Sequence, residues 1–387
     1  STFSHPKLGD TTGYQYTRES NPTRDRLEQL IAGLEDGKDA LAFSSGMAAV
    51  DAVFHLFSPG DHIILGDDLY GGNHDLISRQ ALHAHTVTLT HPETGEAMKF
   101  TAPVPADMEP FMNEGKNMHI ETKSGVSFLT FDVFKNENLI AAVSTKNGGV
   151  STGAYHSLNM GFSTDDAPEK VRENRKRFFD VLGIIPERLV NCALVHGIHM
   201  EKVGKADCGR GAQDFTSAIP ACDGLYTNEK NVPLGLNYAD CTPLLFYDPV
   251  TSSIAVAHGG WRGTAGNIAG EAVRHLQESY GAEPKNIKAG IGPAIGKSVF
   301  EVEKDVVEAF EKIFDKEEMK RLSAPKGEGK ILIDLPLANR ILIERAGILP
   351  ENIEDCGICT YCRNDLFYSY RKAAGRTGRH MAVMMLK

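Results

Sequence analysis

In NYADCTPLLFYDP (237–249) and AVAHGGWRG (255–263), a potential metal ligand stands beside turn residues at the end of an apolar run. LVHG (194–197) has the same arrangement. Each run holds one ligand beside a strand-like segment: His196, Cys241 and His258. Two imidazoles and one thiolate suit Zn²⁺ in an open site, whose fourth position stays free for water or substrate. The ligands are separated by 45 and 17 residues, whereas a zinc finger brings its ligands in close pairs. We therefore expect a catalytic zinc site built from separate loops.

The local sequence favours this interpretation over the common alternative, in which a His or Cys beside an apolar strand is a packed core residue. Pro243 interrupts the strand pattern, so the Cys241 thiol should lie at a strand end. Gly259 and Gly260 follow His258 directly and allow the backbone to approach a ligand closely.

Residues from about 125 to the C-terminus resemble the bacterial purine nucleoside phosphorylase family that was formerly classed as multicopper polyphenol oxidases or laccase-domain proteins. In that family the metal is zinc, held by the His of a QVHG-like run, the Cys of ADC and the His of AHxGWRG. These positions correspond to His196, Cys241 and His258, while Leu194 stands where a Gln is usual and could alter the surroundings of the first ligand. Further runs match in order: STKNGGVSTGAYHSLNMGFSTDD (144–166), VRENR (171–175), GAQDFTSAIPACDGLYT (211–227), GIGPAIGKSVFEV (290–302), CTYCRNDLFYSYRK (359–372) and TGRHMA (377–382).

The resemblance implies zinc-dependent phosphorolysis of adenosine, inosine, guanosine and S-methyl-5′-thioadenosine, with purine nucleosides and phosphate as partners. It also implies adenosine deaminase activity in the same pocket, because a zinc-bound water with a pKa near 7 can attack C6 of adenine. An older family label gives a copper-dependent polyphenol oxidase as an alternative. The chain has only 14 His and no His-x-His pair near the three runs, which argues against several copper ions.

Three polar residues are expected to take part in the chemistry. Arg262 follows His258 by four residues and could carry phosphate or transition-state charge. Asp240 precedes Cys241 and could orient a ligand His or act as a general base, although capping a neighbouring helix explains it equally well. Asn159 lies in a glycine-containing loop run and could donate hydrogen bonds.

Three further residues are expected to bind substrate. Lys146 lies in the same kind of loop run as Asn159, and Trp261 is the only Trp and follows the glycines after His258. Arg175, in VRENR, could bind phosphate or lie on a solvated helix face.

The composition of the chain changes near residue 112. Residues 1–112 contain 7 basic and 16 acidic residues and no Cys, whereas residues 113–387 contain 34 basic and 35 acidic residues and all seven Cys. Neither part has the basic excess of a nucleic-acid-binding protein. We expect three segments: 1–73, 74–112 and the phosphorylase-like domain 113–387.

Residues 13–72 resemble the N-terminal part of Cys/Met-metabolism pyridoxal-phosphate enzymes such as cystathionine γ-synthase. The resemblance implies cofactor contacts for Tyr16, Arg18 and Tyr70, and the sequence after Asn21 predicts a helix with an apolar face. The Schiff-base Lys and the acidic partner of the pyridine nitrogen lie in later parts of that family, so no bound pyridoxal phosphate is expected.

Residues 77–109 resemble the C-terminal end of RluA-type pseudouridine synthases, without the motif that holds their catalytic Asp. TVTLTH and MKFTAP, separated by turn residues, predict a β-hairpin. Two truncated family ends before a complete domain suggest a fusion. The alternative is an appended, non-catalytic binding module.

For the C-terminal segment the pattern predicts an α/β domain with mixed β-sheets and flanking helices in several layers, preceded by the truncated α/β fragments. No apolar stretch is long enough for a membrane span and the N-terminus has no signal-peptide pattern, so a cytoplasmic location is expected, with monomer and homodimer both open. The C-x₂-C-x₂-C run of Cys356, Cys359 and Cys362 could hold a metal, but without an evident fourth ligand structural thiols are expected. The expected strands are 125–134, 139–145, 189–196, 234–240, 243–249, 253–259 and 287–293, and the expected helices are 168–183, 266–281, 302–314 and 334–347.

Overall fold

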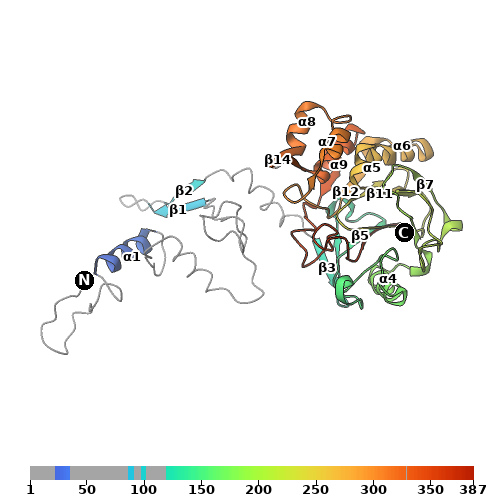
Figure 1. Ribbon diagram of the computed structural model, residues 1–387, viewed down its shortest axis with the longest axis horizontal. Coiled ribbons are helices and arrows are strands. Elements are labelled where there is room, and N and C mark those ends of the chain that lie inside the picture. Colours follow the sequence, from blue (N-terminus) through green and yellow to red (C-terminus); the bar gives the residue numbers. More distant parts are fainter. Residues whose placement is uncertain (1–21, 35–85, 91–96, 102–118, 328) are drawn as a thin grey trace. The chain divides into compact units, whose positions relative to one another are not determined.

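The computed structural model describes residues 22–34, 86–90, 97–101, 119–327 and 329–387 (Figure 1). The chain divides into two units, Ser1–Pro110 and Phe111–Lys387, and each is described by itself.

The first unit contains the helix and the hairpin that the sequence predicts. Helix α1 (Pro22–Leu34) carries the exposed side chains of Leu27, Leu30 and Ile31. Strands β1 (Thr86–Thr90) and β2 (Ala97–Thr101) pair in antiparallel fashion, which confirms the hairpin. The residues expected from the pyridoxal-phosphate resemblance, Tyr16, Arg18 and Tyr70, lie outside the described residues.

Two six-stranded mixed sheets form the centre of the second unit. The first sheet has the order β3 (His119–Lys123), β4 (Val126–Thr130), β5 (Leu139–Ser144), β17 (His380–Leu386), β9 (Leu234–Tyr238) and β6 (Val190–Asn191). The second has the order β16 (Ile353–Asp355), β12 (Lys288–Ile291), β10 (Thr242–Asp248), β11 (Ser253–Gly259), β8 (Gly224–Thr227) and β7 (Met200–Lys202). A small sheet pairs β13 (Glu301–Val302), β15 (Lys330–Ile333) and β14 (Ser323–Gly327).

The two large sheets pack face to face, with β9 and β17 against β10 and β11. Helix α4 (Pro168–Leu182) covers the outer side of the first sheet, and α6 (Ile268–Tyr280) and α9 (Leu335–Arg345) cover that of the second. Figure 1 shows α4 and the α6–α9 group on opposite sides of the sheets. Three buried apolar clusters lie between these layers. The expected multilayer α/β architecture is confirmed. The short helices α5 (Trp261–Ala265), α7 (Lys304–Phe310) and α8 (Lys316–Leu322) complete the helical side.

Strands β10 and β11 bring two of the expected ligands together. All seven residues of each strand are buried, as their near-continuous apolar sequence demands. The antiparallel register pairs Thr242 with Gly259 and Pro243 with His258. Cys241, directly before β10, therefore lies beside the end of β11 that carries His258.

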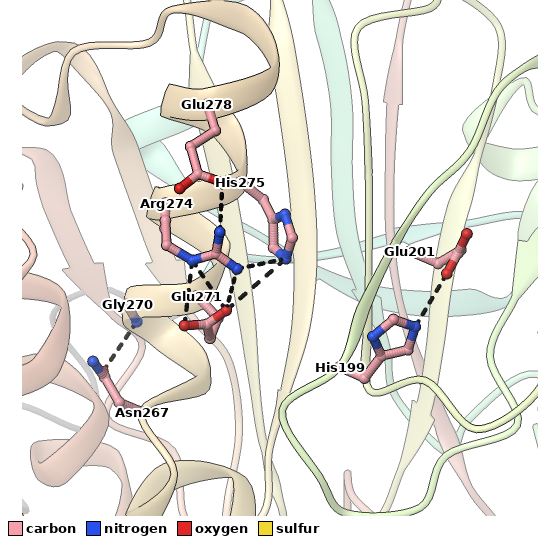
Figure 2. A network of polar contacts seen from close by, with 8 residues as sticks. All are labelled: His199, Glu201, Asn267, Gly270, Glu271, Arg274, His275 and Glu278. Carbon is pink, nitrogen blue, oxygen red and sulfur yellow. Dashed lines mark hydrogen bonds and ion pairs between the residues drawn. The ribbon is translucent and has the colours of Figure 1, made fainter.

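Helix α6 illustrates how local sequence sets element ends. Asn267 caps its N-terminus by accepting a hydrogen bond from the Gly270 amide at 3.1 Å, and Gly281 ends it in the left-handed conformation. On its exposed face Arg274 bridges Glu271 and Glu278, as Figure 2 shows beside the His199–Glu201 contact of β7.

The predicted strand 189–196 is wrong beyond β6. His196 has a positive φ of 62°, and the amides of His196 and Gly197 donate to a buried carboxylate rather than to a strand partner. Strand β17 occupies the middle of the first sheet and is not among the strands expected from the sequence. No helix of the described segments is long and apolar enough to cross a membrane.

Candidate metal centre and its cavity

The structure brings His196, Cys241 and His258 together, with their donor atoms all within 4.8 Å of one another. A tetrahedral zinc ion with Zn–N and Zn–S bonds of about 2.0–2.3 Å holds such atoms roughly 3.3–3.6 Å apart. Small side-chain movements would therefore close the group around one ion. His258 is buried, Cys241 is half-buried and His196 is exposed, so the site opens on the side of His196.

The electrostatics of the group favour a thiolate. Burial raises the pKa of the Cys241 thiol, but the positive charge of His258 and hydrogen bonds from both imidazoles outweigh burial and lower it to about 6. Burial lowers the pKa of His258, and the Cys241 thiolate together with Asp223 outweighs that effect and raises it to about 9. A divalent cation can thus replace the proton of His258 and meet a sulfur that is already ionised.

Asp223 is the residue that sequence reasoning missed. Its fully buried carboxylate accepts the amides of His196 at 2.7 Å and Gly197 at 2.6 Å, and lies 3.3 Å from Nδ1 of His258. Burial raises the pKa of this carboxyl, but the hydrogen bonds from His258 and the amides outweigh it and the net shift is downward. Asp223 thus fixes the backbone of one ligand and the ring of another, leaving Nε2 of His258 for the metal. The only sequence signal for Asp223 was its place in ACDGLYT (221–227), part of one of the runs that match the family.

Gly260 keeps the centre open. A Cβ at this position would lie 3.1 Å from Cδ2 of His196 and 3.3 Å from Sγ of Cys241. A larger residue would displace both ligands.

A cavity of about 470 Å³ opens from the three ligands. Its wall carries three arginines, Arg175, Arg371 and Arg379, and among the described residues no carboxylate pairs with them within 4.0 Å. Cations in a cavity wall that make no direct ion pair with a carboxylate are suited to an anionic ligand. Other lining residues include Phe162, Asn191, Asp214, Phe215, Asn237 and Tyr370.

Arg175 is buried, so the alternative of a solvated helix face is wrong. Its guanidinium donates to the carbonyls of Met160, Gly211 and Ala212 at 2.6–2.9 Å and to Oδ1 of Asn237 at 3.1 Å. Burial lowers its pKa to about 9.

Asp240 and Asn159 hold the cavity wall in place. Asp240 accepts hydrogen bonds from Thr360 Oγ1 at 2.6 Å, from Ser369 Oγ at 3.1 Å and from the Arg371 amide at 2.7 Å. The carboxylate that reaches His258 is thus that of Asp223. Asn159 is fully buried and accepts the amide of Arg379 at 2.9 Å.

The remaining expected residues lie apart from the ligands. Trp261 and the exposed Arg262, whose guanidinium lies 4.2 Å from the indole centroid, line a neighbouring cavity of about 420 Å³ that shares Phe300 and Arg371 with the first. Lys146 lines neither cavity; its ammonium donates to the carbonyl of Asn364, and burial lowers its pKa.

Comparison with known proteins identifies the second unit. Residues 140–387 match the family described as multi-copper polyphenol oxidoreductase laccase, and residues 1–148 match Cys/Met metabolism PLP-dependent enzymes. Purine nucleoside phosphorylase YlmD of Bacillus subtilis (strain 168) is 38% identical over 252 residues, 65% of this chain and 90% of the relative. Purine nucleoside phosphorylase YlmD of Geobacillus stearothermophilus is 41% identical over 247 residues, 63% of this chain and 89% of the relative. The crystal structure of YlmD from Geobacillus stearothermophilus superimposes with a TM-score of 0.66 at 37% identity, covering 70% of this chain and 99% of that one.

Proposed function

Because the chain belongs to the multi-copper polyphenol oxidoreductase laccase family, whose relatives named above are purine nucleoside phosphorylases, we propose that it is a zinc-dependent purine nucleoside phosphorylase. The reaction joins phosphate to C1′ of the ribose while the bond from C1′ to the purine breaks, giving the free base and ribose 1-phosphate. The observation that carries the proposal is the group His196, Cys241 and His258 at one end of a cavity whose three arginines make no ion pair with a carboxylate of the described residues.

The cavity supports a substrate with an anion at one end. Its volume of about 470 Å³ lies in the range of about 300–1,000 Å³ that is usual for small-molecule sites. Arg371 and Arg379 would hold the phosphate, and the buried Arg175 would add positive charge in the same cavity wall. The exposed rings of Phe215 and Tyr370 are suited to stacking against a purine.

The donor set fits zinc, since one thiolate and two imidazoles match its preferred ligands. When bound, the metal supplies a Lewis acid and lowers the pKa of a water that it binds, which would also serve adenosine deamination. Asp223 would keep the ring of His258 in the orientation and tautomer that the ion requires.

A multicopper oxidase needs several metal groups. Within the described segments, His196, Cys241 and His258 form the only cluster of three or more metal-ligating side chains. The geometry therefore supports a single metal ion, and two imidazoles with one thiolate suit zinc. Copper in the purified protein would favour the oxidase alternative.

The assay is phosphate-dependent release of hypoxanthine from inosine and of adenine from adenosine by the full chain, with elemental analysis of the same sample. We expect base and ribose 1-phosphate in equal amounts, about one zinc per chain, and loss of both zinc and activity in Cys241→Ala. The matched control is Cys208→Ser, a half-buried thiol outside the cavity. Full activity of Cys241→Ala, or base release that does not depend on phosphate, would contradict the proposal. Inosine formed from adenosine without phosphate would report the deaminase activity.

We also propose that this chemistry belongs to residues 113–387 and that residues 1–73 and 74–112 are two truncated segments outside it. Supporting this division, every residue named for the site lies after residue 113. The match to Cys/Met metabolism PLP-dependent enzymes covers 1–148 and thus only a fragment of the chain.

A further inference from the structure

Cys359 and Cys362 lie within one turn that follows β16, and neither is in a disulfide. Cys359 is buried, whereas Cys362 is exposed. The Arg363 amide donates to the Cys359 carbonyl at 2.8 Å, which closes one helical turn. In such a turn the Cα atoms of residues i and i+3 are about 5 Å apart, inside the roughly 4.4–6.8 Å that a disulfide spans. The backbone can therefore accept a bond between the two sulfurs.

The sulfur of Cys359 has the surroundings of a stabilised thiolate. It accepts hydrogen bonds from the amides of Gly296 at 3.2 Å and Cys362 at 3.4 Å. The hydrogen bond from the Cys362 thiol is the main cause that lowers the pKa of Cys359 to about 7, against the effect of burial. Cys356, three residues earlier, differs in that burial raises its pKa well above the usual value. The reactive pair is thus Cys359 and Cys362.

The same turn is bonded to the wall of the cavity. Thr360, between the two cysteines, donates from its amide to the Ala294 carbonyl at 2.9 Å and from Oγ1 to Asp240 at 2.6 Å. Asp240 in turn accepts the amide of Arg371 at 2.7 Å and is the residue directly before Cys241. Two hydrogen bonds therefore connect the cysteine turn to Arg371, which together with Arg379 forms the anion site in the cavity wall.

We propose that Cys359 and Cys362 form a reversible thiol–disulfide exchange site for low-molecular-weight disulfides, and that its state adjusts Arg371 through Thr360 and Asp240. The exposed Cys362 thiol passes its proton to the hydrogen-bonded Cys359 thiolate and attacks a small disulfide. A mixed disulfide forms, and the small thiolate that leaves takes the proton from Cys359. The Cys359 thiolate then attacks the sulfur of Cys362, the internal disulfide forms and the second small thiol leaves. Two protein thiols lose two electrons and two protons, and the external disulfide is reduced to two thiols.

A second sulfur pair provides an internal comparison. Sγ of Cys222 lies 2.9 Å from Sγ of Cys192, but both residues are buried. Burial also raises the pKa of Cys192 well above its usual value. Because both sulfurs are buried and the Cys192 thiol keeps its proton, this pair should stay reduced although the sulfurs are close. The proposal therefore predicts a disulfide between Cys359 and Cys362 and none between Cys192 and Cys222.

Disulfide mapping of the full chain tests the site without reference to its activity. The reduced protein is treated with oxidised glutathione, blocked with N-ethylmaleimide in denaturant and cut with trypsin. Cleavage after Arg345 and Arg363 gives one peptide, residues 346–363, that holds all three cysteines of the run. We expect this peptide to lose two hydrogens and carry a single blocking group, on Cys356, and dithiothreitol to reverse the change. In Cys362→Ser the mixed and internal disulfides should both disappear.

The effect on Arg371 is read from phosphorolysis, and this part rests on the proposed function. Oxidation should raise the KM for phosphate about fivefold, the factor that corresponds to one hydrogen bond of about 1 kcal/mol, with kcat less affected. Thr360→Val should still form the disulfide but show the raised KM in both redox states. Cys208→Ser should behave as wild type. A disulfide at Cys192–Cys222 instead, or a peptide 346–363 that stays fully reduced, would overturn the site, and an unchanged KM in the oxidised protein would overturn the link to Arg371.

Discussion

Replacing Asp223 by Asn tests whether this buried carboxylate builds the metal centre. The amide has the same shape, and its oxygen can still face the His196 amide and Nδ1 of His258. Its NH₂ group, however, would meet the Gly197 amide, a donor facing a donor where the structure has a 2.6 Å hydrogen bond. The negative charge that stabilises the His258 ring is also lost.

The expected size follows from these contacts. Losing one hydrogen bond to a charged acceptor costs about 1.5–3 kcal/mol of folding stability. Looser orientation of two metal ligands costs, in addition, about 10–100-fold in zinc affinity, or roughly 1.4–2.8 kcal/mol. Folding and metal binding should therefore both weaken in Asp223→Asn.

Asp248→Asn is the matched control, because it separates these two effects. Asp248 is also fully buried and accepts the Val250 amide at 3.0 Å and Thr251 Oγ1 at 2.7 Å, in the β10–β11 turn at the strand ends opposite Cys241. Thermal unfolding of the metal-free proteins should show both variants destabilised. Chelator competition should show weakened zinc binding in Asp223→Asn alone. Wild-type zinc affinity in Asp223→Asn, or an equal loss in Asp248→Asn, would refute the role given to Asp223.

Three further outcomes are expected. Between about pH 7 and 9 zinc should displace one proton, from His258 with its pKa of about 9, because Cys241, with its pKa of about 6, is already a thiolate there. Zinc affinity should rise about tenfold per pH unit in this range and level off above pH 9, and calorimetry in buffers of different ionisation enthalpy counts the displaced proton. Arg371→Met and Arg379→Met should each raise the KM for phosphate about 10–100-fold in steady-state assays, because a charge-assisted hydrogen bond is lost, at unchanged zinc content; an unchanged KM would remove these residues from the anion site. Residues 113–387 alone should keep the zinc and the phosphorolysis rate of the full chain, and a large loss of either would give the N-terminal segments a role.

The sequence predicted that His196, Cys241 and His258 lie together, because their signal is local. Cys241 and His258 stand at the ends of two strands whose apolar runs are unmistakable, and the antiparallel register then sets them side by side. The wall of the cavity has no such signal. Arg371 and Arg379 come from a segment more than a hundred residues later, which the pairing of β17 with β9 and the hydrogen bonds to Asp240 and Asn159 bring to the site.

Nearness in sequence does not decide which polar side chains face the three candidate ligands. Arg262 follows His258 closely, but Gly260 begins a new helix there, and the arginine turns to the neighbouring cavity. Asp240 precedes Cys241 with a positive φ of 79°, and its carboxylate is directed to the C-terminal segment instead of a ligand His. The direction of the backbone beside a candidate ligand thus decides which neighbouring side chains face the site. Sequence spacing alone does not reveal that direction.

The charges of the site make two of the three candidate ligands, Cys241 and His258, interdependent. Without metal, the Cys241 thiolate and the His258 imidazolium compensate each other. A zinc ion would displace the imidazolium proton and would add one net positive charge to a cavity that already holds Arg175, Arg371 and Arg379. Phosphate should therefore bind more tightly to the zinc-loaded protein, and by linkage zinc should bind more tightly in the presence of phosphate by the same factor. Because both effects come from one electrostatic coupling, added salt should weaken them together.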